Sequence, residues 1–242
     1  MFKKSILLAT IAIASYCNTI AIAQKTSVDN TLSAAEKKDG WKLLFDGKTL
    51  AGWKGYKKDT VGNAWIVEKG TLHLSKGGAG DVMTKDEFEN FELKLEWKIV
   101  EGGNSGIFWG VVENNDYKNT YETGPEMQVL DDDKHSDAKA GKDGNHQAGS
   151  LYDMIPAKNK KLKKPGVEFN QVLIKKLKNN VEFYLNGVKV VSFAQGSPEW
   201  DKMVAESKFN GWKGFGKYAN GHIALQDHGD KVWYKNIKIR KL

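Results

Sequence analysis

Residues 91–99 alternate charged and apolar side chains without an exception. The charged positions are Glu92, Lys94, Glu96 and Lys98, and the apolar positions between them are Leu93, Leu95, Trp97 and Ile99. Successive side chains of a strand point to opposite faces, so this period of two predicts a strand with one solvated and one buried face. A strand of this kind needs a second layer over its apolar face. The segment therefore predicts a layered β-structure.

Other segments predict neighbouring strands. Residues 181–185 and 188–193 flank Asn186-Gly187, a dipeptide typical of the type I′ turn of a β-hairpin. Residues 64–74 predict two short strands around a turn, and residues 232–242 predict a closing strand. Short helices are expected only near residues 33–38 and 198–207. We therefore predict an all-β chain that folds as an antiparallel β-sandwich.

The first residues have the pattern of an export signal. Lys3 and Lys4 precede an apolar stretch, and Ala21-Ile22-Ala23 is a small-residue cleavage site. We predict a signal peptide at residues 1–23, a linker at 24–40 and one domain at 41–242. The apolar stretch is short for a membrane span, so no stable membrane insertion is expected.

The signal predicts secretion across the inner membrane. A lipoprotein anchored through Cys17 is the less favoured alternative, because Tyr16 stands where a small residue is expected. Cys17 is the only cysteine and leaves with the signal peptide, so the mature domain has no disulfide.

The formal net charge of +7 is scattered along the chain. Its densest part, the lysine run within residues 158–164, has no interleaved aromatic residues, so it predicts a solvated loop and no nucleic-acid partner. Phosphate-binding and dinucleotide fingerprints are missing from the sequence, so no nucleotide cofactor is expected. The long polar loops 131–149, 153–166 and 196–219 are predicted to border a cleft.

Two segments carry the residues best suited to chemistry. In residues 125–131 the alternation places Glu126 and Gln128 on one face of a strand, opposite Met127 and Val129. In residues 221–229 it places His222, Gln226 and His228 together, although His222 and His228 share a cleft only if the sheet curves. The predicted catalytic residues are Glu126 and His228, either of which can act as a general base or acid. The predicted substrate-binding residues are Asn104, Trp109, Gln128, Tyr152, His222, Gln226 and Asp227.

A divalent metal ion is a further candidate. Asp131, Asp132 and Asp133 with His135 offer oxygen and nitrogen ligands, but acidic clusters in loops are usually solvated. No spacing in the chain matches a zinc signature. The metal ligands therefore stay open.

Taken in order, five motifs resemble the 3-keto-disaccharide hydrolase family over nearly all of residues 40–242. They are Leu43-Leu44-Phe45-Asp46-Gly47-Lys48-Thr49-Leu50 with Gly52-Trp53, then Asn104-Ser105-Gly106-Ile107-Phe108, Glu126-Met127-Gln128-Val129-Leu130-Asp131, Gly149-Ser150-Leu151-Tyr152, and Gly221-His222-Ile223-Ala224-Leu225-Gln226-Asp227-His228-Gly229. The sequence departs from the family at Trp109-Gly110, where a Leu-Arg pair is common.

The resemblance implies a concanavalin-A-like jelly roll that is exported, to the periplasm in the family's usual hosts, and that acts on glycosides already oxidised to a ketone at C3. A 3-keto group acidifies the C2 proton, so a base can remove it, the C1 substituent can leave, and water can add to the double bond. This route needs no second carboxylate. It implies a carbohydrate substrate, a divalent metal ion and a functional link to a sugar 3-oxidoreductase. The alternatives are a non-catalytic carbohydrate-binding module and a conventional glycosidase.

Overall fold

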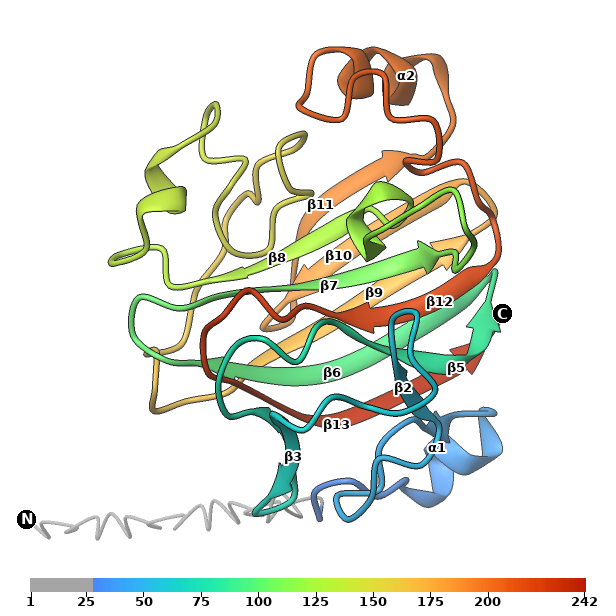
Figure 1. Cartoon of the computed structure of the whole chain (residues 1–242), viewed down its shortest axis with the longest axis vertical. Coiled ribbons are helices and arrows are strands. Elements are labelled where there is room, and N and C mark those ends of the chain that lie inside the picture. The colour runs from blue at the N-terminus through green and yellow to red at the C-terminus, as the bar shows by residue number, and fades with distance from the viewer. Residues whose placement is uncertain (1–27) are drawn as a thin grey trace, which may run out of the picture.

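The computed structural model describes residues 28–242 and contains two antiparallel sheets packed face to face (Figure 1). The larger sheet has eight strands in the order β11-β10-β9-β6-β13-β4-β3, with β1 paired to β13. Its strands are β1 (Lys42–Leu43), β3 (Trp65–Glu68), β4 (Thr71–Leu74), β6 (Phe91–Ile99), β9 (Asn170–Leu177), β10 (Asn180–Leu185), β11 (Val188–Ala194) and β13 (Val232–Lys241). The smaller sheet has the order β2-β5-β12-β7-β8. Its strands are β2 (Trp53–Gly55), β5 (Val82–Phe88), β7 (Asn104–Val111), β8 (Glu126–Leu130) and β12 (Gly221–Leu225).

The core lies between the two sheets, as the alternation in residues 91–99 requires. The apolar side chains of β6 that the sequence placed inward are all buried, and so are Ile237 and Ile239 of β13. From the smaller sheet, Ile107, Met127 and Ile223 enter the same core. The predicted antiparallel β-sandwich of the jelly-roll class is therefore confirmed.

Backbone geometry explains the turns. The turn between β10 and β11 places Asn186 at φ 50° and Gly187 at φ 80°, and a type I′ turn needs positive φ at both positions. The turn between β3 and β4 likewise has positive φ at Lys69 and Gly70. Both hairpins lie where the sequence predicted them.

Two short α-helices flank the sheets, α1 (Ala34–Lys38) and α2 (Pro198–Ala205). Ser33 and Glu36 form a capping box at the start of α1, and Ser197 caps α2 ahead of Pro198. Both helices therefore start at residues suited to that position, within the predicted segments. No helix of residues 28–242 is long and apolar enough to cross a membrane.

The segment before β1 packs onto the larger sheet. The backbone N–H of Asn30 donates to Oδ1 of Asn236, and the N–H of Asn236 donates to Oδ1 of Asn30. Asn236 lies where the pairing of β13 with β6 shifts register. The segment around Asn30 therefore binds β13 at an irregular position of the strand. From residue 28 onward the predicted linker is therefore part of the domain. The predicted signal peptide lies outside the described residues.

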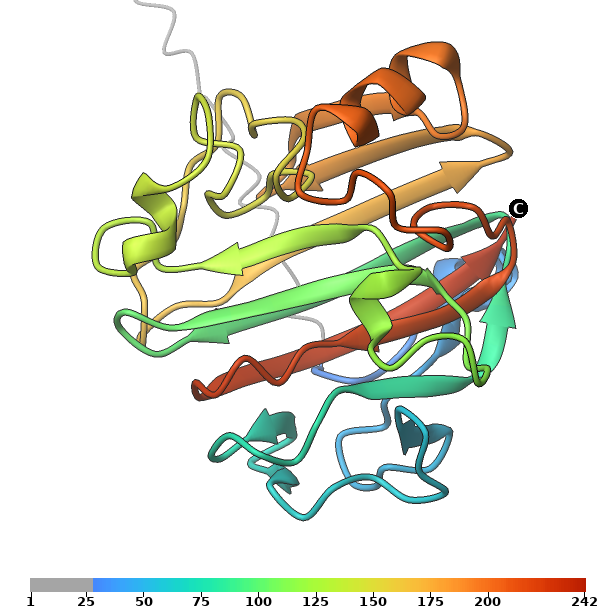
Figure 2. The same cartoon turned by 45° about the horizontal axis from the view of Figure 1, so that its top comes forward.

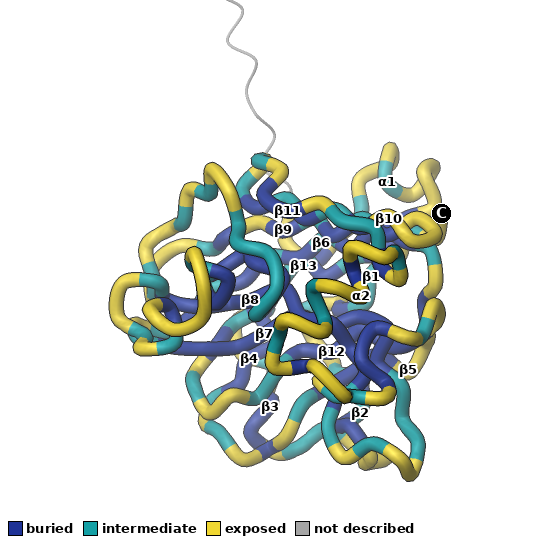
Figure 3. The backbone as a smooth tube through the Cα atoms, turned by 90° about the horizontal axis from the view of Figure 1, so that it is seen from above, coloured by how far each residue is buried: buried dark blue, intermediate teal, exposed yellow. Residues whose placement is uncertain are grey.

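The long loops gather around one face of the smaller sheet. Residues 131–169 continue from β8 and include the 3₁₀ helix η2 (Ser136–Lys139), and a second 3₁₀ helix, η1 (Thr120–Glu122), lies ahead of β8 (Figures 1 and 2). The residues of β7, β8 and β12 are buried throughout, although each strand has one face outside the core, and Figure 3 shows these strands beneath exposed loops. The loops therefore cover the outer face of this sheet and shield its side chains from solvent.

Candidate active site

Glu126 and Gln128 lie on the loop-covered face of β8, and Met127 and Val129 point into the core. The side chains separate in this way because successive strand residues point to opposite faces. Glu126 is nevertheless only 7% exposed, and Gln128 only 1%. The site is therefore a recess that holds polar groups away from bulk water.

Gly106 of β7 makes room for the Glu126 carboxyl group. Gly106 pairs with Gln128 in the sheet, and a Cβ atom on Gly106 would lie 2.2 Å from Oε1 of Glu126. The carboxyl group therefore lies over the backbone of β7. Burial raises the pKa of Glu126 to about 8, with Lys208 acting against this shift and Asp81 and Asp137 adding to it. A carboxylate with such a pKa is a stronger base than a solvated one.

Residues 149–152 add to the edge of β8 and bring Tyr152 beside Glu126. The N–H of Tyr152 donates to the carbonyl of Glu126, and the N–H of Gln128 donates to the carbonyl of Ser150. Burial and the carboxylates of Asp137 and Glu126 raise the pKa of Tyr152. Its phenol therefore stays neutral at working pH and can donate a hydrogen bond.

A buried histidine joins the loops around this tyrosine. His146 lies between two carboxylates, with Nδ1 2.8 Å from Oδ1 of Asp137 and Nε2 2.7 Å from Oδ1 of Asp153. The other oxygen of Asp153 accepts from the backbone N–H of Lys208, whose ammonium lies 4.1 Å from the centre of the Tyr152 ring. This network places a cation next to the recess that holds Glu126.

A pocket of about 420 Å³ lies beside these residues. It is lined by Asn104, His135, Ser136, Asp137, Ala140, Tyr152 and His228. Oδ1 of Asn104 and Oε1 of Gln226 are buried and have no hydrogen-bond partner among residues 28–242. Buried acceptors are normally satisfied, so these two oxygens are available to the hydroxyl groups of a ligand or to a cation.

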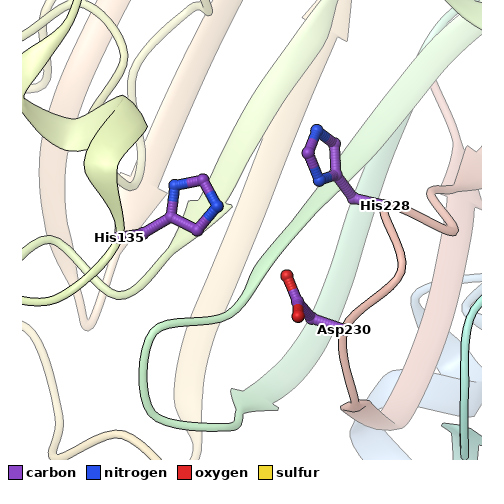
Figure 4. A group of neighbouring side chains, drawn as sticks. All are labelled: His135, His228 and Asp230. Carbon is purple, nitrogen blue, oxygen red and sulfur yellow. The ribbon is translucent and has the colours of Figure 1, made fainter.

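Three side chains around this pocket point toward one another: His135, His228 and Asp230 (Figure 4). One ligand atom from each lies within 4.8 Å of the others. Two imidazole nitrogens and a carboxylate oxygen, with the free amide oxygen of Asn104 in the same pocket, are a donor set that suits a borderline divalent cation such as Zn²⁺ or Mn²⁺. The three residues therefore fit a metal ion.

The acidic run after β8 has a different role. Asp131 accepts hydrogen bonds from the backbone of Gly102 and Asp133, and Asp132 accepts one from Ala148 and pairs with Lys160 at 2.5 Å. These carboxylates hold loops together. Of the residues that the sequence offered as metal ligands, only His135 belongs to the three-residue group.

The predicted strand of residues 221–229 ends at Leu225, so the alternation assumed for its second half is wrong. His222 pairs with Glu87 and Val111 toward the start of β12, and its Nε2 lies 3.4 Å from Oε1 of Glu87. His228 instead follows the end of the strand and lines the pocket, which His222 does not. The sheet therefore does not bring the two histidines into one site.

Asp227 was also expected to bind substrate, and the structure shows contacts of its carboxylate within the protein. Its Oδ2 accepts hydrogen bonds from the N–H groups of Ala79 and Gly80, and its Oδ1 accepts one from Gly229. The carboxylate therefore fixes the loop that carries His228 and Asp230.

Trp109 lies in the core and cannot contact a ligand. Its side chain is 1% exposed, packs edge-on against Phe183, and donates its indole N–H to Gln195. The alternation along β7 explains this, because Asn104, Gly106 and Phe108 share the face opposite Trp109. The prediction that Trp109 binds substrate is therefore wrong.

Sequence reasoning missed Lys208, His146 and Asp137. His146 and Lys208 lie in loops and Asp137 in the short 3₁₀ helix η2, all without apolar periodicity. No pattern therefore distinguishes them from solvated residues. The one available signal was loop length. Of the three loops predicted to border a cleft, residues 131–149 line the pocket and residues 196–219 contribute Lys208, whereas residues 153–166 do not line it.

Comparison with known proteins gives related sequences and structures. A family model described as a 3-keto-alpha-glucoside-1,2-lyase-like domain matches residues 40–240. A 3-keto-disaccharide hydrolase of Bacteroides thetaiotaomicron is 37% identical, over 94% of this chain and 86% of its own. The crystal structure of a proposed glycosyl hydrolase of Parabacteroides distasonis superimposes with a TM-score of 0.82 at 37% identity, over 89% of this chain and all of that one. A second from the same organism has a TM-score of 0.65 at 31% identity, over 84% of this chain and 99% of its own.

Proposed function

Because the chain belongs to the 3-keto-alpha-glucoside-1,2-lyase-like family, we propose that it cleaves glycosides whose sugar carries a ketone at C3. The observation that carries this proposal is Glu126: a buried carboxyl group of raised pKa, beside a pocket lined by the unpartnered amide oxygen of Asn104. Removal of a proton from carbon needs such a base.

The proposed reaction is an elimination followed by hydration. Glu126 takes the C2 proton, and the electron pair of the C–H bond forms the C1–C2 double bond through the enolate. The C1–O bond breaks, and the leaving group departs with the proton that Glu126 had taken. Water then adds across the double bond and gives the free 3-keto sugar. Tyr152, which lines the pocket, would hold a hydroxyl group of the sugar, and Lys208 would stabilise negative charge in the recess. Gln128 is instead bonded to Asp137 and to the N–H of Val129, and it would support the floor of the recess.

The environments of Glu126 and His228 favour Glu126 as the base. His228 is exposed and belongs to the group with His135 and Asp230, whereas Glu126 is buried at the floor. A conventional glycosidase would need a second carboxylate facing the same bond. Asp137 is near, but its oxygens are occupied by His146 at 2.8 Å and Gln128 at 3.4 Å. This arrangement favours elimination with a single base.

His135, His228 and Asp230 would hold the metal ion that the family resemblance implies. When bound, such an ion would act as a Lewis acid toward oxygens of the keto sugar. The chain's own residues orient the sugar and move its proton.

Adding Mn²⁺, Co²⁺ or Zn²⁺ to chelator-treated protein is expected to raise its Tm, since a ligand that binds only the folded state stabilises it by about 2.7 kcal/mol at 100 times its Kd. His228→Ala is expected to abolish this shift, because the variant removes one ligand from an exposed position. His222→Ala, a histidine outside the group, is the matched control and should keep it. An unchanged metal-induced shift in His228→Ala would show that the ion binds elsewhere.

We also propose that the protein works after export, since its first residues have the pattern of a signal peptide. The proposed substrate carries a ketone that ordinary glycosides lack. A sugar 3-oxidoreductase must therefore act before this protein.

The experiment that tests the function compares 4-nitrophenyl glucoside with its 3-keto counterpart, using purified residues 24–242 with and without chelator. Release of nitrophenol from the keto sugar alone is expected. Release from the unoxidised glucoside would favour a conventional glycosidase. Binding of the keto sugar without release would favour a carbohydrate-binding module.

A further inference from the structure

A second hollow, of about 310 Å³, lies next to the segment that leads into β8. It is lined by Tyr117, Tyr121, Glu122, Trp212, Lys213 and Gly214. Three of these residues are in or near η1, which ends four residues before Glu126. The hollow therefore adjoins the end of β8 that carries the proposed base, whereas His135 lies in the loop beyond the other end.

The wall of this hollow is an accessible aromatic surface. Six of the eight tryptophans are buried, and Trp212 and Trp233 are the two that are partly exposed. Trp212 lies 5.8 Å from Tyr121, centre to centre, and the Tyr121 side chain is 38% exposed. Trp233 is instead stacked on His73 in the larger sheet. Aromatic faces that stay open in this way suit the apolar face of a ring-shaped ligand.

Aromatic and cationic contacts connect this hollow to the pocket beside Glu126. The ammonium of Lys208 lies 4.1 Å from the centre of the Tyr152 ring and 5.3 Å from that of Phe209. Phe209 is 5.3 Å from Trp212, which contacts Tyr121. A continuous line of side chains therefore runs from Tyr152, at the polar pocket, to Tyr121, at the aromatic hollow.

The aromatic hollow is held in place before any ligand binds. The carbonyl of Thr123 accepts from the N–H of Gly216, and the hydroxyl of Thr123 accepts from the N–H of Val112. Thr120 also donates its hydroxyl hydrogen to Asp81. These bonds join η1 to three other segments of the chain. Tyr121 is therefore already positioned, and ligand binding does not have to order it.

We propose that this hollow is the leaving-group subsite, which receives the pyranosyl or aryl group attached to C1 of the keto sugar. The inference rests on the proposed function and deepens it. The polar pocket and the aromatic hollow differ in chemistry. The pocket, with Asn104, His135 and His228, offers groups that bind hydroxyls and a cation. The hollow offers the ring faces of Tyr121 and Trp212. The keto sugar therefore belongs at the polar end and the leaving group at the aromatic end, with Glu126 and Lys208 between them.

The test uses two 3-keto glucosides that differ only in the leaving group, methanol or 4-nitrophenol, and a 3-keto disaccharide as a third substrate. Tyr121→Ala is the first variant, because the ring is partly exposed and its removal leaves the core intact. Trp212→Leu is the second, and it keeps an apolar side chain against Phe209. Trp233→Ala removes the other partly exposed indole and is the matched control.

Tyr121→Ala and Trp212→Leu are expected to lower kcat/KM roughly tenfold for the aryl glycoside and the disaccharide, a loss of about 1.4 kcal/mol. The same variants should change kcat/KM less than about twofold for the methyl glycoside. Trp233→Ala should affect the three substrates alike. An equal loss on all three substrates in the site variants, or no loss, would overturn the subsite. If the wild-type protein turns over none of the three, the proposed function itself fails.

Discussion

Glu126→Gln is expected to lower kcat on a 3-keto glycoside by about 10²–10⁴-fold, the usual contribution of a positioned base. Glutamine has nearly the shape of glutamate but cannot accept the C2 proton. In the wild-type protein, kcat/KM should rise with pH and level off above a pKa of about 8, because only the ionised carboxylate is a base. This limb of the profile, measured between pH 6 and 10, should be missing from the residual activity of the variant.

The same substitution should stabilise the fold at high pH. The folded-state pKa of Glu126 is raised above its unfolded value, so the folded protein binds the proton more tightly and loses stability as the pH rises through the interval up to about 8. Glutamine does not ionise and removes this loss, which is on the order of a few kcal/mol. The Tm of Glu126→Gln should therefore exceed that of the wild type above pH 8, and the two should converge near pH 4.

Glu92→Gln is the matched control for both measurements. Glu92 is buried to a similar degree, but it lies on β6 of the other sheet, paired with Arg240 at 2.5 Å. This variant should keep its turnover and the pH profile of the wild type. Near-normal turnover in Glu126→Gln would contradict the role assigned to Glu126.

Gly106→Ala is expected to reduce kcat by about 100-fold, because an error of about 1 Å in the placement of a catalytic group can cost that much. The added Cβ would lie 2.2 Å from Oε1 and 2.7 Å from Cδ of Glu126, so the carboxyl group must leave its position. The φ of Gly106 is not positive, and alanine can adopt its backbone. The collision, and not backbone strain, is therefore the cause of the loss.

A double-mutant cycle isolates this cause. In the wild-type background Gly106→Ala should lower the free energy of unfolding by about 1–3 kcal/mol through overpacking. In the Glu126→Ala background the space over β7 is empty, so the same change should cost much less. An equal cost in both backgrounds would show that Gly106 is needed for some reason other than room for Glu126.

The alternation of single strands predicted much of the candidate site. It placed Glu126 and Gln128 on the same outer face and Met127 in the core, because a pleated strand leaves no other arrangement. The same rule, applied to Trp109, places that residue in the core beside Ile107. Its assignment to substrate binding was therefore inconsistent with the strand that contains it.

The rule failed where the strand ended. Residues 226–229 look like a continuation of β12, but Asp227 turns its carboxylate to the N–H groups of Ala79, Gly80 and Gly229. Gly229 is close to Asp227 in the sequence, but Ala79 and Gly80 are distant from it. No local pattern could show that the chain leaves the sheet there and carries His228 toward His135.

The sequence by itself determined the two-sheet sandwich, the hairpin turns and the polar face that carries Glu126, because period-two alternation and turn chemistry act between residues close along the chain. Only the tertiary structure decided which loops cover that face. It joined Lys208, His146 and Asp137 around Tyr152, and it brought His135, His228 and Asp230 to one point. Contacts of this kind depend on where loops from distant strands meet. The burial that raises the pKa of Glu126 has the same origin, since it is produced by those loops and not by the strand that bears the residue.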